Sequence, residues 1–208
     1  MTRPVADVLA DRAAAAGLTL PPTLAARLIA YYDLLSHWNR KINLTSLSDP
    51  SEAVDRLLLE PIAAAPSLPP GLELIDLGSG GGSPALPLAL VLNVPRLVMV
   101  ESRGRKAAFL REALRELQLA GEVEAARFEE VSRRPAYAGR FELLSVRAVR
   151  LDAGTLTSVA QLLRPGGVAA LLGNRDAEPQ EVPLDLQLVS TGPLLPSSRS
   201  ALTLLRRQ

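Results

Sequence analysis

A glycine-rich stretch is the part of this chain best suited to bind a ligand. It reads Asp76-Leu77-Gly78-Ser79-Gly80-Gly81-Gly82-Ser83 and follows a short apolar segment. Glycine allows the backbone to approach a ligand closely and to adopt conformations that other residues disfavour. A carboxylate at Asp76 would repel a pyrophosphate but attract a cationic amino-acid group, such as that of S-adenosylmethionine. We therefore expect a site for this cofactor, formed by Asp76, Gly78, Gly80, Gly82 and Ser83.

A nicotinamide dinucleotide is the competing ligand for the same stretch. Residues 80–85 also satisfy a loose G-x-G-x-x-A fingerprint, with Glu101 at about the required distance. Asp76, Pro84 within the turn, and the long helical segment before the first strand all count against a dinucleotide. Because an isolated glycine fingerprint is a weak signal, a turn with a purely structural role is the third possibility.

Three further charged residues follow apolar segments that could be strands of one sheet. Glu101 follows residues 97–100, and a carboxylate there can accept hydrogen bonds from both hydroxyls of a ribose. Arg147 and Arg150 follow residues 141–146. Since ligands bind beyond the carboxyl ends of parallel strands, we expect all three side chains to face the cofactor crevice. Solvated charges without a ligand are the alternative for each of them.

The composition excludes several kinds of chemistry. The 208 residues contain no cysteine, which rules out disulfides, cysteine-ligated zinc, iron–sulfur clusters and a covalent thiolate mechanism. The single histidine, His37, could act as a general base, but its place at the end of a predicted helix favours a surface or capping role. The longest uncharged run, residues 77–95, is interrupted by glycines and prolines, so it cannot span a membrane. We expect a cytoplasmic protein without a metal site.

The charge balance limits how the chain could bind nucleic acid. Lys and Arg number 23 against 22 Asp and Glu, which gives a net charge of +1. Such a chain does not coat nucleic acid through its whole surface, although a local basic patch remains possible. Aromatic residues make up only 3%, which argues against large stacking platforms for bases.

Two kinds of element must position these side chains. Residues 1–70 are expected to be helical, because apolar residues recur every three or four positions and Asp49-Pro50 is typical of a helix start. From residue 71 onward, apolar segments alternate with helical ones. We predict strands at 72–77, 96–100, 123–128, 141–146 and 168–172, and a closing hairpin at 184–190 and 201–205. This alternation predicts an α/β fold whose parallel sheet is covered on both faces. We place a boundary near residue 70, which separates an N-terminal helical segment (1–70) from a ligand-binding domain (71–208).

Several segments together resemble the RsmG (GidB) family of 16S ribosomal RNA methyltransferases, which modify guanine N7. They are Trp38-Asn39-Arg40-Lys41-Ile42-Asn43-Leu44-Thr45-Ser46, the helix start at Asp49-Pro50, residues 76–87, Glu101-Ser102-Arg103-Gly104-Arg105-Lys106 and Val146-Arg147-Ala148. The W-N-x-x-x-N-L-T segment is the specific one, since the glycine motif marks any class I methyltransferase. The resemblance implies a class I (Rossmann-like) methyltransferase sheet, S-adenosylmethionine as cofactor, and small-subunit ribosomal RNA or the assembling small subunit as partner.

The resemblance also implies roles for single residues. It predicts cofactor contacts at Gly78, Ser83, Phe128, Glu129 and Arg147, with Arg147 as a candidate for positioning. No catalytic base is assigned, because guanine N7 carries a free lone pair and no proton. The basic residues expected around the mouth of the crevice are candidates for RNA binding, and scattered solvated charges are the alternative. They are Arg40, Lys41, Arg103, Arg105, Lys106 and Arg150.

The chain departs from the family pattern at three positions. Leu57 replaces a frequent histidine, Ala85 replaces a glycine, and Leu172 replaces a lysine expected at the end of the fifth strand. These departures keep open a degenerate RNA- or ribosome-binding module that has lost catalysis. The sequence also leaves open a methyltransferase with a protein or small-molecule substrate, and a nicotinamide dehydrogenase. We expect the protein to be a monomer.

Overall fold

The computed structural model describes residues 3–69, 73–147, 152–174, 182–196 and 198–208. Within these ranges seven strands form one sheet in the order β3-β2-β1-β4-β5-β7-β6. Neighbours among β1 to β5 run parallel, and β7 pairs antiparallel with both β5 and β6. The strands are β1 (Glu73–Leu77), β2 (Arg96–Val100), β3 (Gly121–Glu124), β4 (Phe141–Arg147), β5 (Leu163–Asn174), β6 (Leu186–Pro193) and β7 (Ser200–Arg207). The predicted α/β fold and closing hairpin are confirmed.

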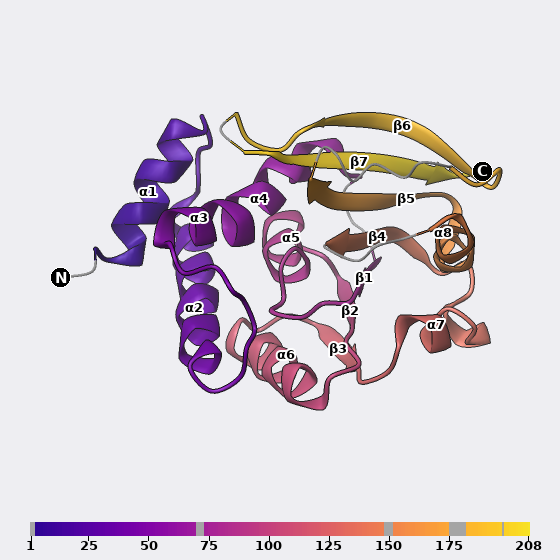
Figure 1. Ribbon diagram of the computed structural model, residues 1–208, viewed down its shortest axis with the longest axis horizontal. Helices are drawn as coiled ribbons and strands as arrows, with labels where there is room; N and C mark the ends of the chain where they lie inside the picture. Colours follow the sequence, from indigo (N-terminus) through magenta and orange to yellow (C-terminus); the bar gives the residue numbers. More distant parts are fainter. Residues whose placement is uncertain (1–2, 70–72, 148–151, 175–181, 197) are drawn as a thin grey trace.

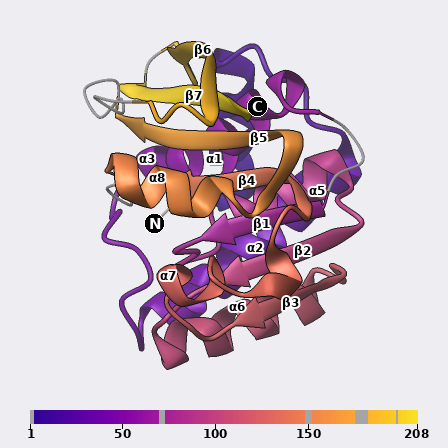
Figure 2. The same cartoon turned by 90° about the vertical axis from the view of Figure 1, so that its right-hand side faces the viewer.

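Helices cover both faces of this sheet (Figures 1 and 2). Helices α1 to α6 lie on one face, and α7 and α8 lie on the other. Their bounds are α1 (Val5–Ala15), α2 (Pro22–Asn39), α3 (Pro50–Val54), the π-helix η1 (Asp55–Leu59), α4 (Glu60–Ala64), the 3-10 turn η2 (Ala65–Ser67), α5 (Ala85–Leu92), α6 (Gly104–Glu116), α7 (Phe128–Val131), the 3-10 turn η3 (Pro135–Tyr137) and α8 (Ala153–Ala160).

Alternating strand residues supply the two halves of the core. In β1, Leu74 packs with the helices of the first face, whereas Ile75 and Leu77 pack with those of the second. The same alternation runs through β2, where Leu97 and Val98 face opposite ways. Side chains on a strand point to opposite faces in turn, so continuous apolar strands require helices on both sides.

The N-terminal helices form part of the same core as the sheet. Leu28 of α2 and Leu58 of η1 are fully buried in one cluster with Leu97 and Leu143 of the sheet. Asp49 caps α3 as predicted, since its Oδ2 accepts a hydrogen bond of 2.8 Å from the Glu52 N–H. These helices therefore form a layer directly on the sheet. The division of the chain into 1–70 and 71–208 stays a prediction.

The strand predicted at residues 123–128 exists, but its predicted bounds are wrong. The structure places β3 at Gly121–Glu124, and Phe128 begins α7. A Cβ at Gly121 would lie 2.6 Å from the Leu97 carbonyl oxygen, so a glycine allows this close approach of β3 to β2. Beyond Glu124 the chain leaves the edge of the sheet. An apolar run such as Ala125-Ala126 therefore does not mark a strand by itself.

Candidate functional site

The turn between β1 and α5 requires glycine at two positions. Gly78 adopts a φ of +71°, and its N–H donates to the Val100 carbonyl over 2.9 Å, which ties the turn to the end of β2. Gly82 adopts a φ of +90°, and a Cβ there would lie 2.5 Å from Cδ1 of Leu86. Another residue at either position would strain the backbone, and at Gly82 its Cβ would also clash with Leu86 of α5. The glycine-rich sequence thus builds a tight turn at the carboxyl end of β1.

The N-terminal segment contacts this turn directly. The Tyr31 hydroxyl of α2 donates to the Gly81 carbonyl over 2.7 Å. A Cβ at Gly81 would lie 3.3 Å from the carbonyl oxygen of Leu44. Asn39 fixes this loop, because its Oδ1 accepts hydrogen bonds from the N–H groups of Leu44 and Thr45 over 2.8 and 2.9 Å. The W-N-x-x-x-N-L-T segment therefore has a structural task, which is to hold a loop against the glycine turn.

Glu101 is 7% exposed and lines a hollow of about 140 Å³ at the end of β2. Its Oε2 accepts the Gly80 N–H over 2.9 Å, and its Oε1 accepts the Arg103 N–H over 2.8 Å. Each carboxylate oxygen has a further lone pair, so both can still accept a ligand hydroxyl. The burial contradicts the alternative of a solvated acid. The complete lining is Gly78, Val100, Glu101, Ser102, Ala126, Arg127, Phe128 and Glu129.

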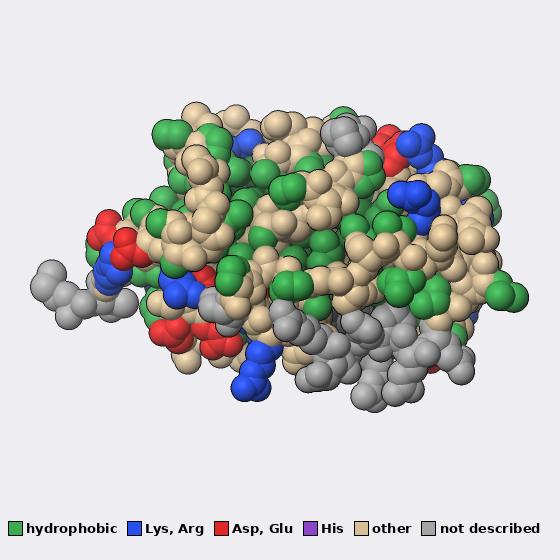
Figure 3. All heavy atoms as spheres, turned by 90° about the horizontal axis from the view of Figure 1, so that it is seen from above, with side chains coloured by type: hydrophobic (Ala, Val, Ile, Leu, Met, Phe, Trp, Pro, Cys, Tyr) green, Lys and Arg blue, Asp and Glu red, His purple; other side chains and the backbone are tan. Residues whose placement is uncertain are grey.

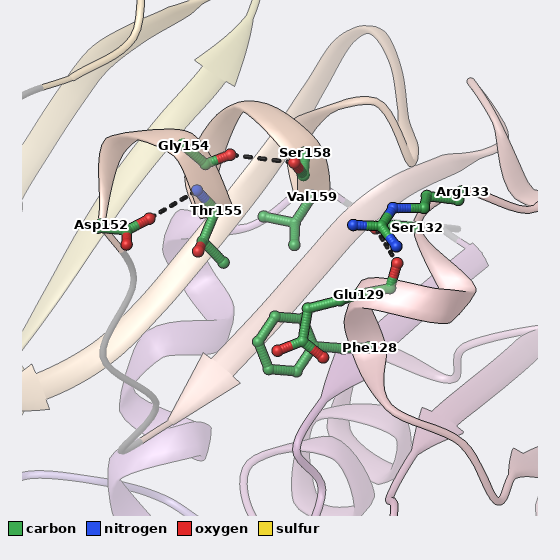
Figure 4. Close-up of a pocket in the computed structure, with 9 residues that line it drawn as sticks. All are labelled: Phe128, Glu129, Ser132, Arg133, Asp152, Gly154, Thr155, Ser158 and Val159. Carbon is green, nitrogen blue, oxygen red and sulfur yellow. Dashed lines mark hydrogen bonds between the residues drawn. The ribbon is translucent and has the colours of Figure 1, made fainter.

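A second hollow of about 220 Å³ lies beside the first, between α7 and α8 (Figure 4). Phe128 and Glu129 line both hollows. Thr155 and Val159 of α8 point across the gap toward the Phe128 ring, and the Arg133 guanidinium extends into it from the α7 side. The two predicted contact residues after β3 thus separate two adjoining spaces.

Asp76 is buried at the end of β1 with one oxygen unpartnered. It is 1% exposed, and its Oδ1 accepts a 2.5 Å hydrogen bond from the Ser145 hydroxyl of β4. Its Oδ2 has no hydrogen-bond partner among the described residues. Burial raises the pKa of this carboxyl to about 6, although the Ser145 hydrogen bond opposes the rise. Asp76 is therefore ready to accept a donor that the described protein does not supply.

Arg147 shows the complementary arrangement at the end of β4. Its Nη1 donates to the Arg56 carbonyl and lies 3.1 Å from Oε2 of Glu60. Its Nε and Nη2 are buried and have no partner among the described residues. Burial lowers the pKa of this guanidinium, and the negative charge of Glu60 opposes the change. Buried donors without acceptors are costly, so an acceptor bound at these two nitrogens would be strongly favoured.

These two unpartnered groups fit the amino-acid end of S-adenosylmethionine. The parallel register aligns Asp76 with Ser145 and Leu77 with Val146, so Asp76 and Arg147 lie near the same edge of the sheet. Arg147 also influences the pKa of Asp76 electrostatically. A carboxylate acceptor and a guanidinium donor match an ammonium and a carboxylate, respectively. Such a zwitterion is what an α-amino acid presents.

Ser83 lies in the turn but is bonded to the helical layer. Its hydroxyl donates to the Leu57 carbonyl of η1 over 2.9 Å. Leu57, the first departure from the family pattern, therefore contributes its backbone to the site. Ala85 is fully buried at the start of α5, and Leu172 is buried within β5, which continues to Asn174. The expectation that Leu172 ends the strand is wrong, because β5 extends along β7 up to Asn174.

The basic candidates for RNA binding lie at the end of α2 and the start of α6. Arg40, Lys41, Arg103 and Arg105 are exposed. Lys106 is half-buried, and its Nζ lies 4.0 Å from where a Cβ at Gly80 would be, which places it over the glycine turn. Arg150 lies outside the described residues. His37 is exposed as expected, with its Nδ1 2.9 Å from the Arg40 guanidinium.

The face above β6 and β7 has a different character (Figure 3). Apolar and uncharged polar atoms cover most of it, and charged side chains lie toward its margins. Leu188 and Val189 of β6 are among the exposed apolar residues. This face is therefore a poor match for a phosphate backbone.

Sequence reasoning missed Tyr31, Glu60, Ser145 and Ser198. Glu60 is 1% exposed and binds both Arg147 and the Ser198 hydroxyl, which donates to its Oε1 over 2.7 Å. An acid within an apolar helical stretch was the available signal. Among the described residues, no group of His, Asp and Glu has the arrangement of a metal site. No helix in the same part of the chain has the length and hydropathy to cross a membrane.

Solved structures with a similar fold include methyltransferases and a [4+2]-cyclase. TrmN from Thermus thermophilus aligns with a TM-score of 0.55 and 20% identity, covering 72% of this chain and 48% of that one. A putative methyltransferase, yhhF from Escherichia coli, aligns with a TM-score of 0.54 and 16% identity, covering 70% and 80%. The [4+2]-cyclase SpnF aligns with a TM-score of 0.59 and 15% identity, covering 85% and 93%. These likenesses establish the class I methyltransferase fold, and they leave the reaction open.

Sequence relatives are more specific. Ribosomal RNA small subunit methyltransferase G of Stenotrophomonas maltophilia is 41% identical over 167 residues, covering 80% of this chain and 76% of the relative. The protein of the same name from Xanthomonas campestris pv. campestris is 42% identical over 164 residues, covering 78% and 74%. The family model of rRNA small subunit methyltransferase G matches residues 24–187. Because this match covers most of the chain, from α2 through the five parallel strands, the chain belongs to the rRNA small subunit methyltransferase G family.

Proposed function

We propose that this protein transfers the methyl group of S-adenosylmethionine to N7 of a guanine in 16S ribosomal RNA. The observation that carries the proposal is the pair of buried, unpartnered groups at the carboxyl edge of the sheet. Asp76 Oδ2 lacks a donor, and Arg147 Nε and Nη2 lack an acceptor, among the residues that the structure describes. The family membership supplies the class of RNA substrate.

The two ends of the cofactor have separate places in this proposal. The adenosine occupies the hollow at the end of β2, where Glu101 accepts the ribose hydroxyls and residues 126–129 contact the base. The amino-acid end lies between Asp76, which accepts from the ammonium group, and Arg147, which donates to the carboxylate. Gly78 and Gly80 allow the cofactor to lie close to the backbone between the two ends.

The reaction requires the methyl donor and guanine N7 to be positioned, and it requires no proton transfer before methylation. A bound cofactor would supply an electrophilic methyl group on its sulfonium sulfur. As the N7 lone pair forms a bond to this carbon in line, the carbon–sulfur bond would break with its electron pair passing to sulfur, and S-adenosylhomocysteine would leave. The protein holds both reactants and excludes water, which converts a bimolecular reaction into one within a complex. No general base is needed, in agreement with the exposed position of His37.

The RNA would approach over the turn that carries Lys106. Arg103 and Arg105 at the start of α6 and Arg40 and Lys41 at the end of α2 supply exposed positive charge near this approach. Since the net charge is only +1, local clusters must supply the attraction for phosphates. A ribosomal substrate implies that the activity is cytoplasmic.

Methyl transfer from labelled S-adenosylmethionine to purified 16S RNA and to assembled small subunits tests the function. We expect incorporation into at least one of them, at a guanine whose N7 methylation makes the RNA chain cleavable by reduction and aniline. The absence of transfer to both, with cofactor binding intact, would favour the non-catalytic binding module. Absence of cofactor binding would overturn the proposal altogether.

A further inference from the structure

The helical run from Pro50 to Ala64 changes its hydrogen-bond register in the middle. Its central part, η1, is a π-helix, and the Glu60 N–H donates to the Asp55 carbonyl five residues before it. Pro61 follows immediately and has no N–H. It can therefore donate neither to Leu57, as an α-helix requires, nor to Arg56, as a π-helix requires. The turn leaves backbone acceptors that the next residue cannot satisfy.

Both of these carbonyls bind side chains of the cofactor site. The Arg56 carbonyl accepts from Nη1 of Arg147, and the Leu57 carbonyl accepts from the Ser83 hydroxyl over 2.9 Å. Arg147 ends β4, and Ser83 ends the glycine turn after β1. One irregular helical turn thus fixes a residue on each side of the site. Irregular turns of this kind occur frequently at functional sites.

Glu60 completes the fixation of Arg147. Its Oε2 lies 3.1 Å from Nη1, and its Oε1 accepts the Ser198 hydroxyl from the segment between β6 and β7. Both contacts of the guanidinium with described residues, to Glu60 and to the Arg56 carbonyl, use the same nitrogen. Nε and Nη2 remain buried and without a partner among these residues. The buried pair does not satisfy Arg147, as a purely structural ion pair would; it orients the two remaining donors.

We propose that Glu60 is a positioning residue that, together with the π turn ending at Pro61, aims Nε and Nη2 of Arg147 at the carboxylate of the cofactor's amino-acid end. This inference rests on the proposed function, because it assumes that the amino-acid end lies between Asp76 and Arg147. It adds that the N-terminal helical layer determines recognition of that end. The adenosine end depends on Glu101 and is independent of Glu60.

Two ligands and one isosteric variant distinguish a positioning role of Glu60 from a purely structural role. S-adenosylhomocysteine carries the amino-acid end, whereas 5′-methylthioadenosine keeps the adenosine and sulfur without it. We expect Glu60→Gln to weaken the binding of S-adenosylhomocysteine by about tenfold or more. This is the effect of weakening a hydrogen bond to a charged group. Binding of 5′-methylthioadenosine should stay within about twofold of the wild type, because that ligand does not reach Arg147. Calorimetry measures both dissociation constants.

Glu73→Gln is the matched control. It also neutralises a glutamate paired with an arginine, since Oε2 of Glu73 lies 2.8 Å from Nε of Arg140 at the opposite end of the sheet. We expect it to leave both ligands unchanged. Glu60→Asp keeps the charge and should restore part of the lost affinity for S-adenosylhomocysteine.

Pro61→Ala keeps the test decisive if Glu60→Gln does not fold. The new N–H competes with Arg147 and Ser83 for the carbonyls of Arg56 and Leu57. We expect weaker S-adenosylhomocysteine binding, unchanged 5′-methylthioadenosine binding and no fall in the thermal midpoint, since the helix gains a backbone donor. A merely structural role would lower the midpoint and affect both ligands together.

The outcomes separate this inference from the proposed function. If the wild type binds both ligands and the Glu60 and Pro61 variants bind S-adenosylhomocysteine as tightly as it does, the inference is wrong and the proposed function stands. Equal weakening of both ligands also overturns the inference. If the wild type binds neither ligand, the proposed function fails and the inference fails with it.

Discussion

The two ends of the proposed cofactor site differ in how their charged groups are satisfied. At the adenosine end, both oxygens of Glu101 accept backbone N–H groups within the site itself. At the amino-acid end, Asp76 and Arg147 each keep buried atoms that no described residue partners. The first end is complete without a ligand, and the second is completed by one. Ligand binding should therefore change the energetics of the second end more strongly.

The two ends also differ in how far apart in the sequence their residues lie. Residues that follow three neighbouring strands, β1, β2 and β3, build the adenosine end. The amino-acid end needs β4, the π turn of the N-terminal layer and Ser198 near the C-terminus. The contacts at the amino-acid end therefore join the sheet, the N-terminal helical layer and the segment before β7. The amino-acid end is thus the place where the helical layer can influence catalysis.

Arg147→Ala should have the largest effect. It leaves Glu60 buried without its counter-charge, which should cost roughly 3–5 kcal/mol of the free energy of unfolding. Urea denaturation measures this loss. The double variant Arg147→Ala with Glu60→Ala should regain much of it, because no buried charge of this pair then remains. A single variant as stable as the wild type would show that the amino-acid end is not held by this pair.

Glu101→Ala should weaken cofactor binding by roughly 1.5–3 kcal/mol, the range for hydrogen bonds to a charged group. In contrast to the Glu60 variants, it should weaken the binding of S-adenosylhomocysteine and 5′-methylthioadenosine alike, because both ligands carry the ribose. The fold should survive, since the buried acid is replaced by a small apolar side chain. Unequal effects on the two ligands in calorimetry would contradict the division of the site into two ends.

The pH dependence of binding should distinguish the two ends further. Above a pH of about 6, Asp76 is ionised and attracts the ammonium of S-adenosylhomocysteine. As the pH falls through about 6, Asp76 takes up a proton, and affinity should fall by up to about tenfold for each pH unit. Binding of 5′-methylthioadenosine should not follow this curve. Asp76→Asn should remove the dependence; a curve that persists in this variant would assign it to another group.

The stability of the unliganded protein should depend on pH in the opposite direction, because the contribution of Asp76 falls as the pH rises. Burial raises the pKa of Asp76 above its ordinary value of 3.8, so the folded state binds a proton that the unfolded state releases. The contribution of Asp76 to stability is fully present below that ordinary value and is lost as the pH rises through about 6. Denaturation of the wild type and Asp76→Asn across this window measures the difference.

Local sequence signals predicted most of the fold, and they also supplied the residues of the proposed adenosine end. The glycine turn, the acid after β2 and the stripe of Phe109, Leu110 and Ala113 on α6 depend on neighbours in the chain, so their patterns are readable. The local signal at Glu60, an acid within an apolar helical stretch, does not reveal its role. Its role depends on Arg147 and Ser198, which only the folded sheet brings to it.

The end of β3, at the edge of the sheet, shows a second limit of prediction from sequence. The apolar residues after Glu124 predict a longer strand, but the Tyr137 hydroxyl and the Arg134 guanidinium hold the Glu124 carboxylate over 2.5 and 2.8 Å. These contacts lie where β3 ends, and the chain then turns away to place Phe128 between the two hollows. A periodic pattern carries no information about such a stop.

Neutralising the basic start of α6 should have the smallest effect, and it addresses RNA alone. Arg103 and Arg105 are exposed, so their side chains are accessible to a phosphate backbone. Each phosphate contact contributes close to one unit to the slope of log affinity against log salt. Arg103→Gln with Arg105→Gln should therefore weaken RNA binding at every sequence and flatten the slope by about two units or less.

Cofactor affinity should hardly change in this double variant, because Glu101 uses only the backbone N–H of Arg103. Arg115→Gln together with Arg111→Gln, further along the same helix, is a control that removes equal charge farther from the glycine turn. Filter binding across a salt series measures both variants. If the Arg103 and Arg105 variant keeps the wild-type affinity and slope, this surface does not contact RNA. The charges of Arg40 and Lys41 at the end of α2 then become the stronger candidates, and the helical layer would contact the RNA as well as the cofactor's amino-acid end.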